Sequence, residues 1–467
     1  MSGAAPVVVA AAGTGAGKTT AAVGLIGALR ARGLRVQPFK VGPDFIDPGH
    51  HSAAAGRPSR NLDSWMVPPD CLRATYAAAA AQADVCVIEG VMGLFDGMSP
   101  GSDEASTAHV ARLLGAPVVA VLDGHTAGRT LRAVALGLCR CDPDLPFAGF
   151  IVNRVRPGPY AEALGAAVAD ATGLPVFGCI APDPAIRVPE RHLGLRPAAE
   201  GADWVAAAAR AVAAGVDLDG LLRALRARGP GALDPPRPAG RPHPGGASGG
   251  SRPRLAVARD EAFHFYYEDN LDLLRAQGLD LVPWSPLRDP APPAGVAGLY
   301  FGGGFPERFA GRLAANVGAR QAVAAAAAAG LPVWGECGGF QYLCRELVDE
   351  DGRSHAMAGV IPARTVMTPG PAGFGYREVR ARRPNLLLPD GGLARGHEFH
   401  WSRVEWDGAW EPAWELGRPA GGPPVADGFA RGSVLAGYVH LHLGSCPAAA
   451  ARLAAACAAC SPGRSFP

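Results

Sequence analysis

The sequence lacks the apolar run that a membrane-spanning helix requires. No stretch of the 467 residues offers the ~20 uninterrupted apolar residues of such a helix. The opening run Val7–Ala12 is apolar, but no basic region precedes it and a glycine-rich loop follows it at once. We therefore interpret this run as a buried strand rather than a signal peptide, and expect a cytoplasmic protein.

An excess of charge of one sign is also missing. The chain has 44 Lys+Arg and 42 Asp+Glu, a net charge of +2, which does not call for nucleic acid or an anionic membrane as a partner. Hydrophobic residues make up 48% and charged residues 18%, a balance typical of a globular α/β protein. A small-molecule partner fits this composition better.

Cysteine pairs at zinc-site spacing are missing too. The ten cysteines are scattered, several of them inside apparent strands or helices, as in a reduced compartment. Cys139 and Cys141 form one close pair and Cys457 and Cys460 another, but neither has a second pair at the spacing of a zinc site. We interpret these cysteines as incidental.

Short β-rich runs alternate with Ala/Leu-rich stretches in two regions of the chain. The predicted strands are Val7–Ala12, Arg35–Lys40, Asp84–Glu89, Pro117–Asp123, Phe147–Asn153, Leu255–Ala258, Leu279–Trp284, Gly298–Phe301, Pro332–Trp334 and Val434–His440. This alternation predicts an α/β fold with two domains, each a mostly parallel sheet flanked by helices. Residues 231–253 are rich in Pro, Gly and Ser, which predicts a flexible linker between domains 1–230 and 254–447, and residues 448–467 form a C-terminal tail.

A glycine-rich loop follows the first predicted strand and opens a helix. In the segment Gly13–Thr20, backbone N–H groups and the helix dipole can cradle phosphates, which points to Thr14, Gly15, Gly17 and Thr20 as nucleotide-binding residues. Lys18 would neutralise phosphate charge, and the Thr19 hydroxyl would hold Mg²⁺. Ala12 stands where the usual first glycine of such loops is expected. The alternative is a glycine-rich turn that binds nothing.

Acidic and basic residues cluster at the ends of further predicted strands. The clusters are Lys40–Asp47, Arg60–Asp63 and Glu89–Gly97. Ligands of open α/β sheets collect at strand ends, and a carboxylate such as Glu89, directly after a buried strand, is well placed for Mg²⁺ or its waters. Each acid taken singly could instead cap a helix or close a turn.

A candidate nucleophile lies in the second region. Pro332–Phe340 reads as strand, tight turn and helix, and the spacing Gly335-x-Cys337-x-Gly339 is the cysteine version of a nucleophile elbow. A thiolate suits glutamine hydrolysis because a covalent thioester splits this reaction into two easier steps. A buried structural cysteine is the alternative.

The candidate base follows in Tyr438–His442. His440 and His442 share one face of an apparent strand end, so the sequence permits either. Backbone N–H groups of the loop Phe301–Glu307, with Gly303 and Gly304, and of Gly338 are candidates for an oxyanion hole. A plain glycine-rich turn is the alternative for the loop.

These motifs together resemble the family of cobyrinic acid a,c-diamide synthase and its aerobic-pathway counterpart, hydrogenobyrinic acid a,c-diamide synthase. The resemblance spans about residues 6–447. Its most specific segments are Lys40–Pro48, Glu89–Gly97, Val188–Leu195, Gly335–Phe340 and Gly396–Ser402.

The resemblance implies a dethiobiotin-synthetase-like P-loop domain joined to a class I glutamine amidotransferase domain. By similarity, Cys337 is the nucleophile and His440 activates it. Other class I enzymes end in His-x-Glu, whereas this chain has His442 at the last position, so the resemblance implies a Cys-His dyad.

Similarity to dethiobiotin synthetase also implies roles in the first domain. Thr19, Asp63 and Glu89 would ligate Mg²⁺, and Asn153 would contact adenine. Lys40, Asp44 and Asp47 would serve carboxylate activation or intermediate binding.

The implied function is the ATP-dependent amidation of the a and c carboxylates of cobyrinic or hydrogenobyrinic acid in cobalamin biosynthesis, with glutamine as the nitrogen source. The reaction would pass through an acyl phosphate. Ammonia would move between the domains by a protected route. The partners are this corrinoid, glutamine and ATP, without nucleic acid or membrane, and the oligomeric state stays open, a homodimer included. Alternatives are the same chemistry on nickel-sirohydrochlorin or a later corrinoid, or a nucleotide-switched binding protein without catalysis.

Overall fold

The computed structural model describes residues 4–125, 128–188, 190–191, 194–195, 202–228, 252–419 and 421–460. The chain forms two compact units, Met1–Ala239 and Gly240–Pro467, here called the N-terminal and the C-terminal unit. Of the predicted linker, residues 231–251 lie outside the described residues, as do residues 461–467 of the predicted tail. The segment Val188–Leu195 is described only in part, because Pro189, His192 and Leu193 lie outside.

The N-terminal unit is built on a seven-stranded sheet in the order β3-β2-β4-β1-β5-β6-β7, and all of its pairings are parallel. The strands are β1 (Ala5–Ala11), β2 (Val36–Val41), β3 (Arg60–Leu62), β4 (Val85–Glu89), β5 (Val118–Asp123), β6 (Phe147–Asn153) and β7 (Val176–Ile180). The five strands predicted in this region are present, and β3 and β7 extend the sheet at its two edges.

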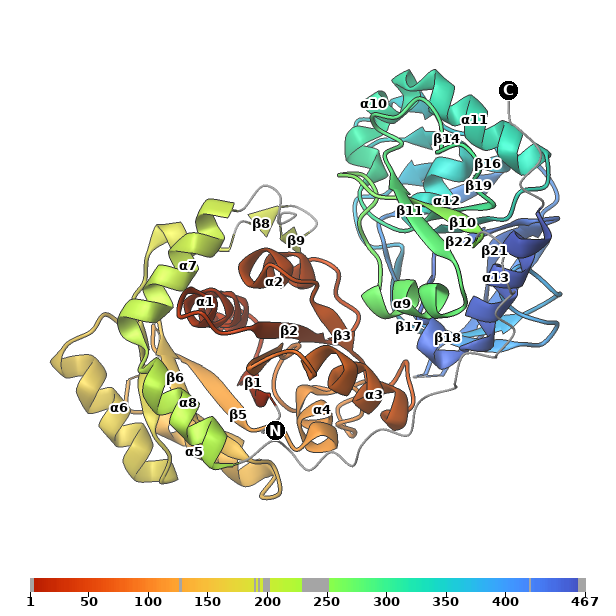
Figure 1. Cartoon of the computed structure of the whole chain (residues 1–467). Coiled ribbons are helices and arrows are strands. Elements are labelled where there is room, and N and C mark those ends of the chain that lie inside the picture. Colours follow the sequence, from red (N-terminus) through yellow and green to blue (C-terminus); the bar gives the residue numbers. More distant parts are fainter. Residues whose placement is uncertain are drawn as a thin grey trace. The chain divides into compact units, whose positions relative to one another are not determined.

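Helices cover both faces of this sheet (Figure 1). They are α1 (Lys18–Ala31), α2 (Asp47–Ala55), α3 (Pro69–Ala80), α4 (Thr107–Leu114), α5 (Leu131–Cys141), α6 (Pro159–Thr172), α7 (Ala202–Gly215) and α8 (Leu218–Ala227), with a 3₁₀ turn η1 (Pro184–Ile186) and a short pair β8 (Glu190–Arg191) and β9 (Gly194–Leu195). In β1, Val7 and Val9 pack into one core with α1, α7 and α8, whereas the intervening Val8 is buried on the opposite face. Burial on both faces explains the unbroken apolar run of β1.

The C-terminal unit contains a ten-stranded sheet in the order β11-β10-β12-β13-β22-β21-β20-β17-β18-β23. The strands are β10 (Arg254–Ala258), β11 (Asp280–Trp284), β12 (Gly298–Phe301), β13 (Val333–Glu336), β17 (Gly373–Ala381), β18 (Leu393–His400), β20 (Pro412–Gly417), β21 (Val425–Arg431), β22 (Val434–Gly437) and β23 (His440–Leu441). The sheet is parallel from β11 to β22, as predicted, and antiparallel from there to β23.

A smaller sheet and seven helical segments complete the described part of this unit. The sheet has the order β15-β14-β16-β19, with β14 (Cys344–Val348), β15 (Ser354–Ala356), β16 (Ile361–Met367) and β19 (Ser402–Trp406). The helices are α9 (Glu268–Ala276), α10 (Ala310–Ala315), α11 (Val317–Ala328), α12 (Gly338–Leu343) and α13 (Ala448–Ala459), with 3₁₀ turns η3 (Pro306–Phe309) and η4 (Leu443–Ser445). The larger sheet separates two cores, with Phe301 and Val333 in one and Tyr300 and Trp334 in the other.

One predicted strand is divided in the structure. Val434–His440 was expected to be continuous, but β22 ends at Gly437 and β23 begins at His440. β22 pairs with β13 and β21, whereas β23 pairs with β18. The break carries the chain from the middle of the sheet to its edge. No helix in the described part of the chain has the length and apolar content needed to cross a membrane.

Candidate active sites

The glycine-rich loop of the N-terminal unit leads from β1 into α1. Gly17 adopts φ 96° directly before the helix, and a Cβ there would lie 2.0 Å from Asn153 Nδ2, so both backbone conformation and space require glycine. Lys18 begins the helix, and its Nζ donates a hydrogen bond to the carbonyl oxygen of Gly13 (2.9 Å). Thr14 and Gly15 are exposed at the loop surface, while the Thr20 hydroxyl donates to the carbonyl oxygen of Ile186 (3.4 Å).

The last residue of β6 and the residue after it contact the same loop. Asn153 Nδ2 donates to the carbonyl oxygen of Ala16 (2.9 Å), so the predicted adenine contact lies beside the loop. Arg154 donates to the carbonyl oxygen of Gly15 (2.7 Å) and pairs with Asp123 (2.7 Å). Sequence reasoning missed Arg154, whose side chain links the loop to Asp123 at the end of β5.

Four side chains from different segments meet in a buried cluster below the loop. Lys40 Nζ at the end of β2 lies 2.6 Å from Asp47 Oδ2 and 3.0 Å from Glu89 Oε1. The Thr19 hydroxyl donates to the same Glu89 oxygen (2.7 Å). The cluster gathers because β2 and β4 are parallel neighbours whose carboxyl ends lie together. Asp44 stands at its edge, 3.8 Å from Lys40 Nζ.

His51 also belongs to this cluster, although the sequence analysis did not identify it. Its Nε2 lies 2.5 Å from Glu89 Oε2, and its Nδ1 lies 3.3 Å from the Ser59 hydroxyl. Asp47 and His51 are four residues apart on α2 and therefore share one helix face. That spacing was the signal that could have identified His51.

Lys40 and Glu89 stabilise each other's charged forms, whereas the surroundings of Asp47 oppose its ionisation. Burial opposes the charged form of Lys40, but the carboxylates of Asp47, Glu89 and Asp44 raise its pKa overall. Burial likewise opposes ionisation of Glu89, and Lys40 together with the hydrogen bond from His51 holds its pKa below the usual range. Burial raises the pKa of Asp47, and the nearby carboxylates of Asp44 and Glu89 add to the effect.

Lysine is confined to this site. The chain has two lysines, Lys18 and Lys40, and each acts electrostatically on the other. Burial lowers the pKa of Lys18, and Lys40 lowers it further. One carboxylate oxygen, Asp47 Oδ1, is buried without a hydrogen-bond partner among the described residues. A buried oxygen of this kind can accept a hydrogen bond from a polar ligand.

Asp63 follows β3, two strands away from Glu89 in the sheet. Its Oδ1 accepts hydrogen bonds from the N–H groups of Trp65 (2.9 Å) and Met66 (2.7 Å). The aspartate therefore closes a turn, and its role as a metal ligand stays a prediction.

In the C-terminal unit, Cys337 lies in a strained turn between β13 and α12. Its φ of 48° lies in the region that favours glycine. The strain is held by backbone hydrogen bonds, because Cys337 N–H donates to Gly437 O (2.8 Å) and Gln341 N–H donates to Cys337 O (3.0 Å). This is the geometry of a nucleophile elbow.

The predicted oxyanion loop and base lie around this turn. A Cβ at Gly303 would lie 2.3 Å from His440 Cε1, so the imidazole packs on the backbone of Gly303. A Cβ at Gly338 would lie 3.1 Å from the backbone nitrogen of Gly304. The loop therefore contacts two parts of the site. Gly304 lies next to Gly338, the residue after Cys337, and Gly303 lies next to His440.

His442 has a different environment. Its Nδ1 accepts a hydrogen bond from Gly444 N–H (3.2 Å), and its ring centroid lies 4.9 Å from that of Tyr267. His442 therefore serves as the cap of η4, and the contact with Gly303 distinguishes His440 as the stronger candidate base.

Burial sets the protonation states at this site. It raises the pKa of the Cys337 thiol, and the carboxylates of Glu307, Glu336 and Glu398 raise it further. Burial lowers the pKa of His440 to about 3. The thiol and the imidazole are therefore both neutral near pH 7, and the thiol proton leaves only when a base accepts it.

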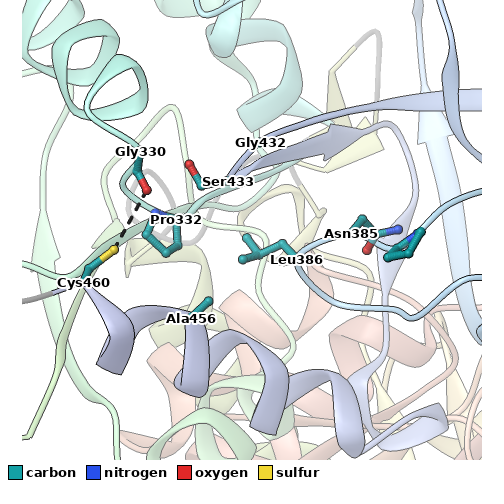
Figure 2. A pocket seen from close by; sticks show the side chains of 9 residues that line it. Gly330, Pro332, Asn385, Leu386, Gly432, Ser433, Ala456 and Cys460 are labelled. Carbon is teal, nitrogen blue, oxygen red and sulfur yellow. Dashed lines mark hydrogen bonds between the residues drawn. The ribbon is translucent and has the colours of Figure 1, made fainter.

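A cavity of about 360 Å³ in the same unit lies elsewhere (Figure 2). It is lined at the amino ends of β13 and β22 by Pro332 and Ser433, and Leu386 and Cys460 also line it. Cys337 follows the carboxyl end of β13, so this cavity is separate from the nucleophile.

Comparisons with known proteins identify the family of the chain. A model of the CobQ/CobB/MinD/ParA nucleotide binding domain matches residues 7–195, and a model of the CobB/CobQ-like glutamine amidotransferase domain matches residues 254–448. Cobyrinate a,c-diamide synthase of Syntrophotalea carbinolica is 41% identical over 95% of this chain and 96% of its own length. The chain belongs to the a,c-diamide synthase family. Hydrogenobyrinate a,c-diamide synthases of Streptomyces coelicolor (41% identical, covering 97% of each chain) and Thermobifida fusca (42% identical, covering 96% of each chain) are similar to it.

Membership of the a,c-diamide synthase family accounts for the two separate centres. The two family models match different parts of the chain. The match to the nucleotide binding domain contains the cluster of lysines and carboxylates, and the match to the glutamine amidotransferase domain contains Cys337 and His440. The two matches also agree with the α/β fold predicted for both regions.

Proposed function

We propose that this chain uses ATP and glutamine to convert the a and c carboxylates of cobyrinic or hydrogenobyrinic acid into amides. The residues 1–230 would carry ATP and the corrinoid, and residues 254–447 would release ammonia. The observation that carries the proposal is the presence, on one chain of this family, of a glycine-rich loop with a buried Lys40–Glu89 pair and of a strained Cys337 with the loop Gly303–Gly304 packed between it and His440.

In the N-terminal unit, the corrinoid carboxylate attacks the γ-phosphorus of ATP, which gives an acyl phosphate and ADP. Activation is needed because a carboxylate resists attack by ammonia. Phosphoryl transfer requires alignment and charge neutralisation, for which Lys18 and the loop N–H groups are suited. Asp44 and Asp47, beside Lys40, would position the carboxylate or its intermediate.

The oxygen ligands near the loop fit Mg²⁺. The Thr19 hydroxyl and Glu89 carboxylate are hydrogen-bonded to each other, and hard oxygen donors with substrate phosphates form the usual coordination of this ion. We propose Thr19 and Glu89 as its ligands, with Asp63 assisting. The ion would neutralise phosphate charge.

In the C-terminal unit, the Cys337 sulfur attacks the amide carbon of glutamine while His440 accepts the thiol proton. Backbone N–H groups of Gly304 and Gly338 would stabilise the oxyanion, and His440 would return the proton to the leaving ammonia. Water then hydrolyses the thioester to glutamate. The ammonia attacks the acyl phosphate, which yields the amide and inorganic phosphate.

The test is Cys337→Ser in the full chain, with Mg²⁺, ATP and each corrinoid acid supplied separately. Mass spectrometry should show two added amides with the native protein and glutamine. The variant should lose glutamine-dependent product and keep ammonium-dependent product. Absence of product from the native protein with either nitrogen source would refute the proposal.

A further inference from the structure

The two peptide groups that flank Leu441, the residue after His440, are each held by a buried side chain. Leu441 N–H donates to Glu336 Oε1 (2.9 Å), and Leu441 C=O accepts from Asn270 Nδ2 (2.7 Å). Glu336 directly precedes Cys337 in the chain. One carboxyl group thus links the strand that ends at the nucleophile to the strand that begins at the base.

Both clamping side chains are themselves fixed. The Tyr300 hydroxyl donates to Glu336 Oε2 (2.8 Å), and the Tyr300 ring stacks on Trp334 with centroids 4.0 Å apart. Asn270 Oδ1 accepts from Leu443 N–H (2.7 Å). Glu336 is 3% and Asn270 1% exposed, so water does not compete for these bonds.

The strand that carries His440 is short and lies at the edge of the sheet. β23 contains two residues and pairs only with β18, where His440 lies opposite His397 and Leu441 opposite Gly396. Two residues of pairing at the sheet edge give weak control over a side chain. The bonds to Glu336 and Asn270 restrain the backbone further, beside the bond from His442 N–H to Arg395 O (3.0 Å) and the packing of the His440 ring on Gly303.

We propose that Glu336 and Asn270 are positioning residues that hold the His440 imidazole at the Cys337 thiol by fixing the peptide groups on either side of the next residue, Leu441. In a triad, a carboxylate fixes the base through its ring nitrogen. Here His442 occupies the position of that carboxylate and bonds to Gly444 instead. The orienting carboxyl group acts on the backbone of the base. This inference rests on the proposed glutaminase reaction.

The experiment compares Glu336→Ala, Glu336→Gln and Asn270→Ala in the full chain. Glutaminase kcat should fall roughly 10- to 100-fold in both alanine variants, because an ångström-scale displacement of a catalytic group has effects of this size. The KM for glutamine should change less than about twofold, since the substrate contacts stay. Glu336→Gln keeps an acceptor for Leu441 N–H and should recover most of kcat.

Two further measurements separate positioning from general loss of structure. Ammonium-dependent amide formation should match the native protein in every variant. Asp289→Ala is the matched control, because Asp289 also accepts a hydrogen bond from a backbone N–H group, that of Ser285 (2.7 Å), in a loop of the same unit. It should leave glutaminase kcat unchanged.

Several results would overturn the inference. These are native kcat in Glu336→Ala and Asn270→Ala, an effect on KM alone, equal loss in Glu336→Gln and Glu336→Ala, or equal loss in Asp289→Ala. Failure of the proposed function is distinguishable, because the native protein itself would then hydrolyse no glutamine.

Discussion

His51 Nε2 lies 2.5 Å from Glu89 Oε2, and both side chains are buried. Lys40 and Thr19 bond the other oxygen of the same carboxylate. Glu89 is therefore held in one orientation at the end of β4, and the histidine supplies one of the three donors that fix it.

Replacing His51 with alanine should lower ATP-dependent amide formation about 10- to 100-fold with glutamine and with ammonium alike. The reason is that a hydrogen bond to a charged group contributes about 1.5–3 kcal/mol. Product formation with each nitrogen source measures the effect. His109→Ala, which removes a half-buried histidine bonded to Ser64, is the control and should retain activity. A loss restricted to glutamine would contradict the assignment of His51 to the ATP reaction.

Replacing Lys40 with methionine should destabilise the N-terminal unit by about 3–5 kcal/mol, because two buried carboxylates lose their cation. Denaturant unfolding followed by fluorescence measures the change. Lys40→Met/Asp47→Asn should recover part of the stability, since one of the uncompensated charges is then absent. Equal stability of the native protein and Lys40→Met would show that the interactions of Lys40 with the two carboxylates make no net contribution to the stability of the fold.

Replacing Gly303 with alanine should abolish glutamine-dependent product, because the new Cβ would displace the His440 ring that lies 2.3 Å away. Rates with glutamine should fall at least about 100-fold, the usual contribution of a general base, while ammonium should still support product. Gly408→Ala is the control, since a Cβ there meets nothing within 4 Å. Normal glutamine use by Gly303→Ala would place the base elsewhere.

The acid–base behaviour of Glu336 should appear in the pH dependence of stability. Burial raises the pKa of Glu336 from 4.5 to about 8. The folded state therefore keeps a proton that the unfolded state releases above pH 4.5, so the stabilisation is complete below that pH and is lost as the pH rises through 8. Relative to Glu336→Gln, the native protein should lose about 1.4 kcal/mol per pH unit across this window. Parallel unfolding curves of the two proteins from pH 5 to 8 would contradict the shift.

The sequence was sufficient to predict a glycine-rich loop between a strand and a helix, because glycine, lysine and threonine at fixed spacing after an apolar strand have few other uses. It also placed Lys40 and Glu89 at the ends of predicted strands, and the structure brings them together because neighbouring parallel strands end at the same edge of the sheet. The break after Gly437 in the predicted strand Val434–His440 was not predicted. The residues on both sides of the break favour strands, and only the strands with which they pair differ.

Residues that act at a distance in the chain escaped prediction. Glu336 occupies the variable position of the Gly-x-Cys-x-Gly motif, and Asn270 lies on a helix 171 residues before Leu441. The antiparallel half of the second sheet was not predicted either. The connection between β17 and β18 is too short for the crossover that parallel strands need, and this length was the feature that could have indicated antiparallel pairing.

The restriction of lysine to positions 18 and 40 has a practical consequence. Apart from the chain terminus, the only primary amines of this protein are the side-chain amino groups of these two residues, and both are buried. An amine-reactive ester or aldehyde should therefore modify them slowly in the folded protein, so dye coupling or immobilisation through amines should spare both lysines until the N-terminal unit unfolds.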